Sequence, residues 1–231
     1  MARGLPLFPL GTVLFPGLVL PLHIFEERYR ALVRDLSALP EGLPREFGVV
    51  AIRQGWEVEE RGPAGSMRAT LALYEIGCTA ELRQVTEHPD GRFDIVVVGR
   101  RRFRIADVSS TTAPYLVAEV DFLPESLGEP GLAEALAPRL LASFRRYLDL
   151  VRPNSPAGSE QLPEDPEVLS HLVAATAMLS LADRQRLLAT ADTANRLRAE
   201  LALLSREAAL LRQVRAVPVP LSELAVPSSP N

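Results

Sequence analysis

The feature that most constrains this chain is its N-terminal stretch, residues 5–36, with the sequence LPLFPLGTVLFPGLVLPLHIFEERYRALVRDL. It carries no charge before Glu26 except for one histidine, and four prolines interrupt it. A continuous apolar helix cannot contain these prolines, and no small-residue cleavage site follows, so we exclude both a membrane span and a signal peptide. Proline suits the ends and edges of strands. The stretch therefore predicts two short strands at residues 5–10 and 18–24, with a turn at 16–17 between them.

A helix is predicted to begin at Glu26, where an acidic residue in the first turn favours the helix dipole. Its apolar residues recur at the i, i+4, i+7, i+8 spacing of a buried helix face. They are Phe25, Tyr29, Leu32, Val33 and Leu36.

The next ninety residues carry the pattern of short strands. Apolar segments at 47–52, 71–82, 93–98, 100–105 and 115–122 alternate with turn residues, and residues 88–91 (His-Pro-Asp-Gly) predict a type I turn in a hairpin. The polar, glycine-rich residues 54–67 are predicted to be a mobile loop that starts near Trp56. Six to eight short strands with one early helix predict a β-barrel or sandwich-like domain of the α+β class.

The composition changes after Pro124, and helical patterns follow at residues 132–151, 166–179, 181–190 and 193–215. We therefore expect three parts: a β-rich domain at 1–124, an α-helical bundle at 125–216, and a flexible tail at 217–231, which holds several prolines and serines.

Composition excludes several classes of chemistry. The net charge is −4, and all 25 basic residues are arginine, so the chain has no lysine for a Walker A loop or for a Ser–Lys dyad. Cys78 is the single cysteine, which rules out an intramolecular disulfide and fits a reducing, cytoplasmic setting. We expect Cys78 to be a buried, inert thiol in a strand.

No catalytic motif is present. The histidines His23, His88 and His171 are far apart in the sequence and lack the spacing of metal ligands, so we predict no catalytic residues, no metal site and no cofactor. The basic cluster of Arg100, Arg102 and Arg104 is the alternative candidate, as a nucleic-acid contact. A net negative domain favours a solvated or salt-bridged strand face instead.

At this point a family resemblance becomes specific. The segments LPLFPL, LFPG and PLHIFEERY resemble the opening of the N-terminal domain of the Lon protease family. Matches follow in order at FGVV (47–50), IGCTAEL (76–82), GRFDIVVVGRRRFRI (91–105) and YLVAEVDFLPE (115–125). A weaker helical match, LADRQRLLATADTANRLRAELALL, extends the resemblance to about residue 212.

The resemblance implies a PUA-like β-domain followed by a helical bundle, a region that serves substrate recognition and assembly in Lon. The chain stops before the ATPase and peptidase modules of that family and lacks the lysines of both. We therefore expect a free-standing, non-catalytic module that binds unfolded or partly folded proteins, as an adaptor in protein quality control beside an ATP-dependent protease. The alternatives are an RNA-binding PUA-like protein, and a small-molecule or enzymatic role for which the sequence offers no constellation.

The candidate contacts for apolar peptide lie in the N-terminal stretch at Phe15, Pro16 and Leu18, with Trp56 as a second candidate. The competing interpretation is that Phe15, Leu18 and Leu20 fill the core, and for any single residue this interpretation is favoured.

Overall fold

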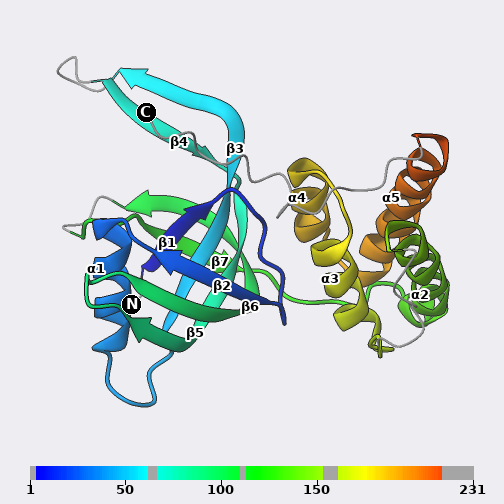
Figure 1. Cartoon of the computed structure of the whole chain (residues 1–231), viewed down its shortest axis with the longest axis horizontal. Coiled ribbons are helices and arrows are strands. Elements are labelled where there is room, and N and C mark those ends of the chain that lie inside the picture. Colours follow the sequence, from blue (N-terminus) through cyan, green and yellow to red (C-terminus); the bar gives the residue numbers. More distant parts are fainter. Residues whose placement is uncertain (1–3, 62–66, 110–112, 153–160, 215–231) are drawn as a thin grey trace.

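The computed structural model describes residues 4–61, 67–109, 113–152 and 161–214, without the side chains of 54–61, 67–71, 109 and 214. Strands form one half of the molecule and helices the other, and α1 lies against the strands (Figure 1). The strands are β1 (Leu5–Leu10), β2 (Val19–Ile24), β3 (Glu46–Arg61), β4 (Met67–Leu73), β5 (Ile76–Glu87), β6 (Phe93–Ser109) and β7 (Val117–Phe122). The helices are α1 (Glu27–Ser37), α2 (Leu132–Val151), α3 (Pro166–Thr176), α4 (Leu181–Ala189) and α5 (Thr193–Val214).

The strands close into a barrel. The order β1-β7-β6-β5-β3 returns to its start because β1 also pairs with β3, in parallel, from Leu7 opposite Gly48 to Leu10 opposite Ala51. The other pairings in the ring are antiparallel, and β2 joins β6 outside it. The α+β class and the barrel predicted from the sequence are confirmed.

Pro21 stands where the sheet tolerates a proline. The N–H of Gly99 on β6 donates to the carbonyl of Leu18 at 2.9 Å, and this bond fixes which pairs along β2 and β6 are hydrogen-bonded. Because such pairs alternate along an antiparallel ladder, Pro21 falls on a position whose nitrogen points away from β6. No hydrogen bond to β6 is therefore lost at this proline.

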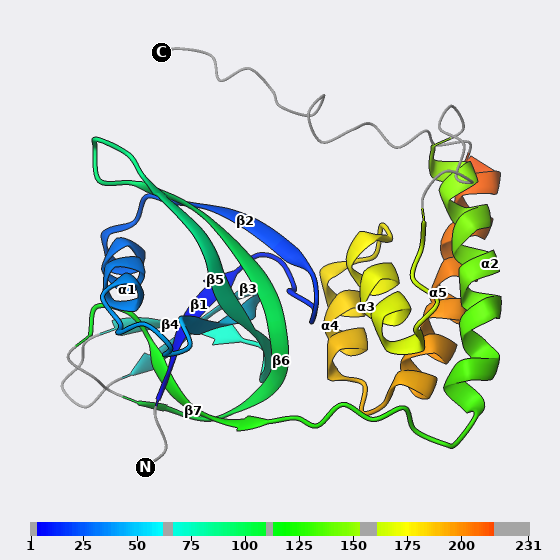
Figure 2. The same ribbon diagram turned by 90° about the horizontal axis from the view of Figure 1, so that it is seen from below.

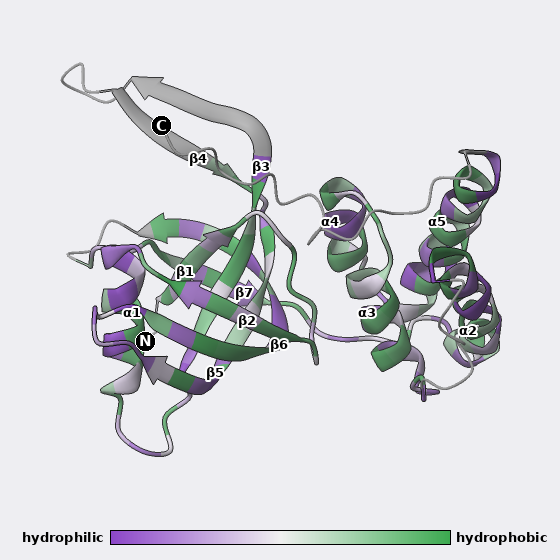
Figure 3. Cartoon of the chain, in the orientation of Figure 1, coloured by the Kyte–Doolittle hydropathy of each residue, from purple (hydrophilic) through white to green (hydrophobic). Residues whose placement is uncertain are grey.

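The barrel has apolar contacts on both faces of β1. Phe8 lies over Tyr29 of α1, with ring centroids 4.0 Å apart and the rings nearly parallel, and it also contacts Phe47. On the other face, Leu5 and Leu7 pack with Phe103. Figure 3 shows β1, β2 and β6 largely in hydrophobic colours. The helix α1 is thus fastened to the barrel through its predicted apolar face, apart from Phe25.

A second core lies inside the helical half, and it includes part of the β-rich half. Val13 and Phe15, between β1 and β2, join the cluster formed by α2, α3, α4 and α5. This connecting segment reaches α3 and α4 in the view of Figure 2. This second core is therefore shared by the two halves, in addition to the apolar contacts inside the barrel.

The four predicted C-terminal helices are confirmed, and the starts of α3 and α4 have the expected caps. Asp165 accepts a hydrogen bond from the N–H of Val168, with Pro166 at the first helical position, and Ser180 accepts one from Asp183. None of the helices in the described ranges is both long and apolar enough to cross a membrane.

One predicted segment is wrong. Residues 54–61 and 67 were expected to be a mobile loop, but their backbone belongs to β3 and β4, which pair from Glu57 opposite Leu71 to Arg61 opposite Met67. This hairpin projects beyond the barrel (Figure 1). The predicted hairpin turn is present, since Gly91 N–H donates to the carbonyl of His88 at 2.8 Å. The division at residue 124 falls between β7 and α2 and stays a prediction, and the predicted tail at 217–231 lies outside the described residues.

Candidate functional site

An apolar groove of about 280 Å³ opens between β1, β2 and the start of α1. Its floor is the stacked pair of Phe8 and Tyr29, both buried. Leu10, Leu22 and Ile24 extend the apolar lining, and Ile52 of β3 adds to it. Pockets for whole small molecules usually measure about 300 to 1,000 Å³, so a groove of this size suits one or two apolar side chains better than a cofactor.

Phe25 lines this groove and is 63% exposed. The sequence pattern placed Phe25 on the buried face of the helix, and this prediction is wrong. The helix begins at Glu27, after the extended residue Glu26, so the 3.6-residue period does not reach Phe25. A largely exposed phenylalanine beside an apolar groove is a typical contact for another apolar surface.

The rim of the groove is polar. Glu26 and Arg28 form an ion pair at 2.7 Å, and the Arg28 guanidinium lies 4.6 Å from the centre of the Tyr29 ring. His23 stands beside them on β2. An apolar centre with a charged rim is the usual composition of a protein-binding surface.

The free edge of β2 shapes how a polypeptide can bind. In the described residues β6 is the strand paired with β2, so the other edge of β2 faces the groove and β1. The outward backbone positions on that edge are Val19, Pro21 and His23, and Pro21 offers no N–H. An added β-strand would lose a hydrogen bond at this proline. The groove therefore favours recognition of side chains over strand addition.

The predicted peptide contacts lie elsewhere. Phe15 has no exposed surface and its ring is 6.1 Å from that of His171, so it fills the core shared by both halves, as the competing interpretation held. Pro16 is buried and Leu18 is half-buried. Contact through Pro16 and Leu18 stays a prediction. Trp56 lies in β3, and its side chain is outside the described residues.

The three arginines of the predicted basic face have different environments in the structure. Arg100 pairs with Glu81 across β5 and β6, and Arg104 is exposed. Arg102 is 1% exposed, so the prediction that it contacts nucleic acid is wrong. A β-bulge between Cys78 and Ala80 shifts the pairing of β5 with β6, and Arg102 points into the junction between barrel and helices.

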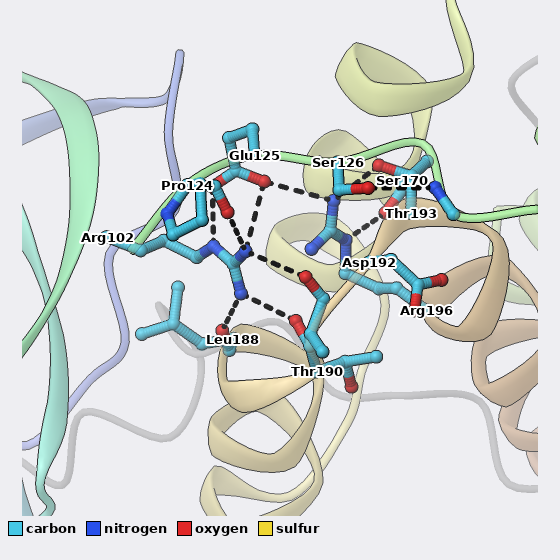
Figure 4. Close-up of polar contacts among 12 residues, drawn as sticks. Arg102, Pro124, Glu125, Ser126, Ser170, Leu188, Thr190, Asp192, Thr193 and Arg196 are labelled. Carbon is cyan, nitrogen blue, oxygen red and sulfur yellow. Dashed lines mark hydrogen bonds and ion pairs between the residues drawn. The ribbon is translucent and has the colours of Figure 1, made fainter. Parts of the chain in front are cut away.

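Figure 4 shows what Arg102 does there. Its guanidinium contacts both oxygens of Glu125, at 2.5 and 3.2 Å, and donates to the carbonyls of Leu188 and Thr190 at the end of α4, at 2.8 and 2.6 Å. The completely buried Arg196 of α5 lies 3.9 Å from Glu125. The junction is a polar network that fixes the two halves to each other.

Among the described residues, Cys78 and His171 are buried, and burial changes the chemistry of both side chains. Burial raises the pKa of Cys78 to about 12, which makes this thiol a poor nucleophile. Burial, with the charges of Arg196 and Arg102, lowers the pKa of His171 to about 2, so this imidazole stays neutral. The other two histidines, His23 and His88, are brought together around Asp94. Sequence spacing gave no sign of this cluster, because cross-strand register creates it.

Comparison with known proteins identifies the scaffold. The family model of the ATP-dependent protease La (LON) substrate-binding domain matches residues 4–206. Lon protease 2 of Herpetosiphon aurantiacus is 33% identical over 208 residues, which cover 88% of this chain and 24% of that protein. The chain thus spans about a quarter of the length of the curated relatives it matches.

Two solved structures share the fold. The N-terminal domain of the Mycobacterium avium complex Lon protease superposes with a TM-score of 0.66 at 20% identity, over 88% of this chain and 98% of that one. A Lon N-terminal domain protein from Xanthomonas campestris superposes with a TM-score of 0.56 at 27% identity, over 87% and 98% of the two chains.

Proposed function

Because this chain belongs to the family of Lon substrate-binding domains, we propose that it is a non-catalytic module that binds exposed apolar segments of unfolded or partly folded proteins. The observation that carries the proposal is Phe25, which is 63% exposed beside the groove floored by Phe8 and Tyr29. Unfolded chains expose apolar side chains that folded proteins bury, and such a groove selects for them.

The groove is a better peptide site than the larger depression between α1 and β5. That depression measures about 560 Å³, and three arginines contribute to its lining: Arg34, Arg45 and Arg83. Its charged lining would leave the apolar side chains of a client without a matching surface. The groove, in contrast, offers stacked aromatic rings and aliphatic walls.

The absence of catalysis is also part of the proposal. The chain has no lysine, and in the described residues Cys78 and His171 are buried with pKa values that disfavour reaction. We propose that the module works in the cytoplasm as an adaptor, holding clients for an ATP-dependent protease that supplies the chemistry. The single buried thiol accords with a reducing compartment.

The test is binding of a permanently unfolded probe, reduced and carboxymethylated α-lactalbumin, measured by fluorescence anisotropy. We expect Phe25→Ser to weaken binding by about tenfold, the effect of removing one aromatic contact residue. Phe122→Ser is the matched control, since Phe122 is 46% exposed on β7, away from the groove, and its loss should leave binding unchanged.

The outcome against the proposal is a wild-type protein that does not distinguish the unfolded probe from native α-lactalbumin, or a Phe25→Ser variant that binds like wild type. The adaptor role has its own measurement. The purified module should accelerate degradation of the same probe by the ATP-dependent protease of the host, and Phe25→Ser should lose this acceleration.

A further inference from the structure

Two histidines and one aspartate converge on the surface beside the groove. His23 Nδ1 lies 2.6 Å from Asp94 Oδ1, and His88 Nε2 lies 2.6 Å from Asp94 Oδ2. The ligand atoms of the three side chains all lie within 4.8 Å of one another. All three are partly open to solvent, with side-chain exposures of 47%, 37% and 53% for His23, His88 and Asp94.

Strands and a tight turn hold these side chains in place. His23 on β2 and Asp94 on β6 are direct cross-strand partners, and Ile24 opposite Phe93 extends the ladder. The turn that carries His88 is closed by hydrogen bonds between His88 and Arg92 at 2.8 Å and between Gly91 and His88 at 2.8 Å. The three groups are therefore positioned by regular backbone before any ligand arrives, which lowers the cost of binding one.

The donor set is two imidazole nitrogens and one carboxylate, a combination that zinc prefers and that leaves a fourth position for water. Asp94 lies between the two imidazoles, with one carboxylate oxygen directed at each. We propose that His23 Nδ1, His88 Nε2 and the Asp94 carboxylate form a surface binding site for a divalent transition-metal ion, Zn²⁺. Each imidazole binds the metal through one ring nitrogen, and the carboxylate supplies negative charge.

Arg92 places a cation close to this site. Arg92 Nη1 lies 3.4 Å from the other ring nitrogen of His23, Nε2, while its Nε contacts Asp90 at 2.6 Å. When His23 binds a metal through Nδ1, its proton resides on Nε2, and Arg92 keeps only its partner Asp90. The guanidinium repels the incoming ion, although the Asp90 carboxylate offsets part of that repulsion. Removing Arg92 should therefore strengthen metal binding.

A second group with suitable ligand types serves as the contrast. Glu125, Glu167 and His171 also lie within ligand distance of one another. Burial, with the positive charges of Arg196 and Arg102, lowers the pKa of His171, and these charges would repel a metal ion as well. Only the surface group therefore combines ligand geometry with access for an ion, in the part of the chain that the structure describes.

The experiment titrates tag-free protein with ZnCl₂ by isothermal titration calorimetry, with MgCl₂ as the oxygen-preferring control ion. We expect one Zn²⁺ per chain and no response to Mg²⁺. His88→Ala and Asp94→Asn should each weaken Zn²⁺ binding by about tenfold or more. Glu87→Gln, next to His88 but outside the cluster, should bind as wild type does, and Arg92→Ala should bind more tightly.

Co²⁺ gives a readout that needs no variant. When Co²⁺ is added to the protein, we expect a visible absorption band with the high intensity typical of four-coordinate Co²⁺. The band should disappear when Zn²⁺ is added and displaces Co²⁺. The proposal is overturned if the wild-type protein binds no Zn²⁺, or if binding survives unchanged in both His88→Ala and Asp94→Asn. Equal weakening in Glu87→Gln would also overturn it, because the effect would then come from surface charge alone.

Discussion

The guanidinium of Arg102, on a barrel strand, donates a hydrogen bond of 2.6 Å to the carbonyl oxygen of Thr190, at the C-terminal end of α4. The last carbonyls of a helix lack partners inside the helix, and the helix dipole is negative at that end. Arg102 therefore supplies both donors and positive charge to the end of α4. Leu188, its second carbonyl partner there, is 86 residues away from Arg102 in the sequence. Glu125 in the connecting segment balances that charge.

We expect Arg102→Met to lower the free energy of unfolding by about 3 kcal/mol, since it leaves the Glu125 carboxylate and the α4 carbonyls without their donor. The matched control is Arg104→Met on the same strand, where the side chain is exposed and the change should stay within about 0.5 kcal/mol. Urea unfolding at neutral pH measures both. Similar losses for the two variants would contradict a special role for Arg102.

Two phenylalanines of the N-terminal stretch should behave in opposite ways. Phe15 has no exposed surface, so Phe15→Ala should cost about 3 to 5 kcal/mol of unfolding free energy. Phe25 is 63% exposed, so Phe25→Ala should change stability by less than about 0.5 kcal/mol while it weakens binding of the unfolded probe. Thermal unfolding separates the two cases, and a stable Phe15→Ala protein would argue against the shared core.

His171 should make stability depend on pH. Burial lowers its pKa from the ordinary value of 6.5 to about 2 in the folded protein, so between these values the unfolded chain binds more protons. The free energy of unfolding therefore falls as the pH falls, by about 2 kcal/mol from pH 7 to pH 5 through this group. His171→Leu should remove that slope. It should cost little at pH 7, because neither ring nitrogen has a hydrogen-bond partner in the described residues. A slope unchanged in the variant would refute this assignment.

Gly77 should not tolerate a side chain. A Cβ atom there would lie 2.4 Å from the carbonyl oxygen of Val49 and 2.6 Å from the ring of Phe103, so Gly77→Ala should destabilise the protein by about 1 to 3 kcal/mol or more. Gly11 is the control, because a Cβ there meets nothing within 4 Å. Denaturant midpoints for the two alanine variants provide the comparison. Equal midpoints would mean that β5 does not approach β3 and β6 as closely as described.

Local chemistry explains how much of the fold was predictable. The strand at Leu5–Leu10 and the helix at Leu132–Val151 were expected with the bounds that the structure has. Both predictions rest on the spacing of apolar residues that are close together in the sequence. Pro166 after Asp165 marked the start of α3 in the same way. The polar composition of residues 54–67 led to the wrong prediction of a loop. Pairing between β3 and β4 can stabilise strands whose composition is typical of loops.

The candidate sites depend on contacts between distant residues, and single-sequence patterns do not contain them. From the sequence, Arg102 was expected on the surface, since arginine is seldom buried. Its burial is possible because Glu125 and Thr190, which are distant in the sequence, bind its guanidinium. His23 and Asp94 meet only through the register of β2 on β6. A one-residue change in that register would place them on opposite faces of the sheet.

The segment Val13 to Phe15 has a consequence for how the molecule unfolds. It is covalently part of the β-rich half, and Leu14 packs there, yet Val13 and Phe15 complete the apolar cluster of the helices. Melting either half would therefore expose apolar surface on the other, and we expect heat to produce a single cooperative transition with equal calorimetric and van't Hoff enthalpies. By the same reasoning, a fragment that ends near residue 124 would expose the apolar side chains of Val13 and Phe15 to solvent, and we expect it to aggregate.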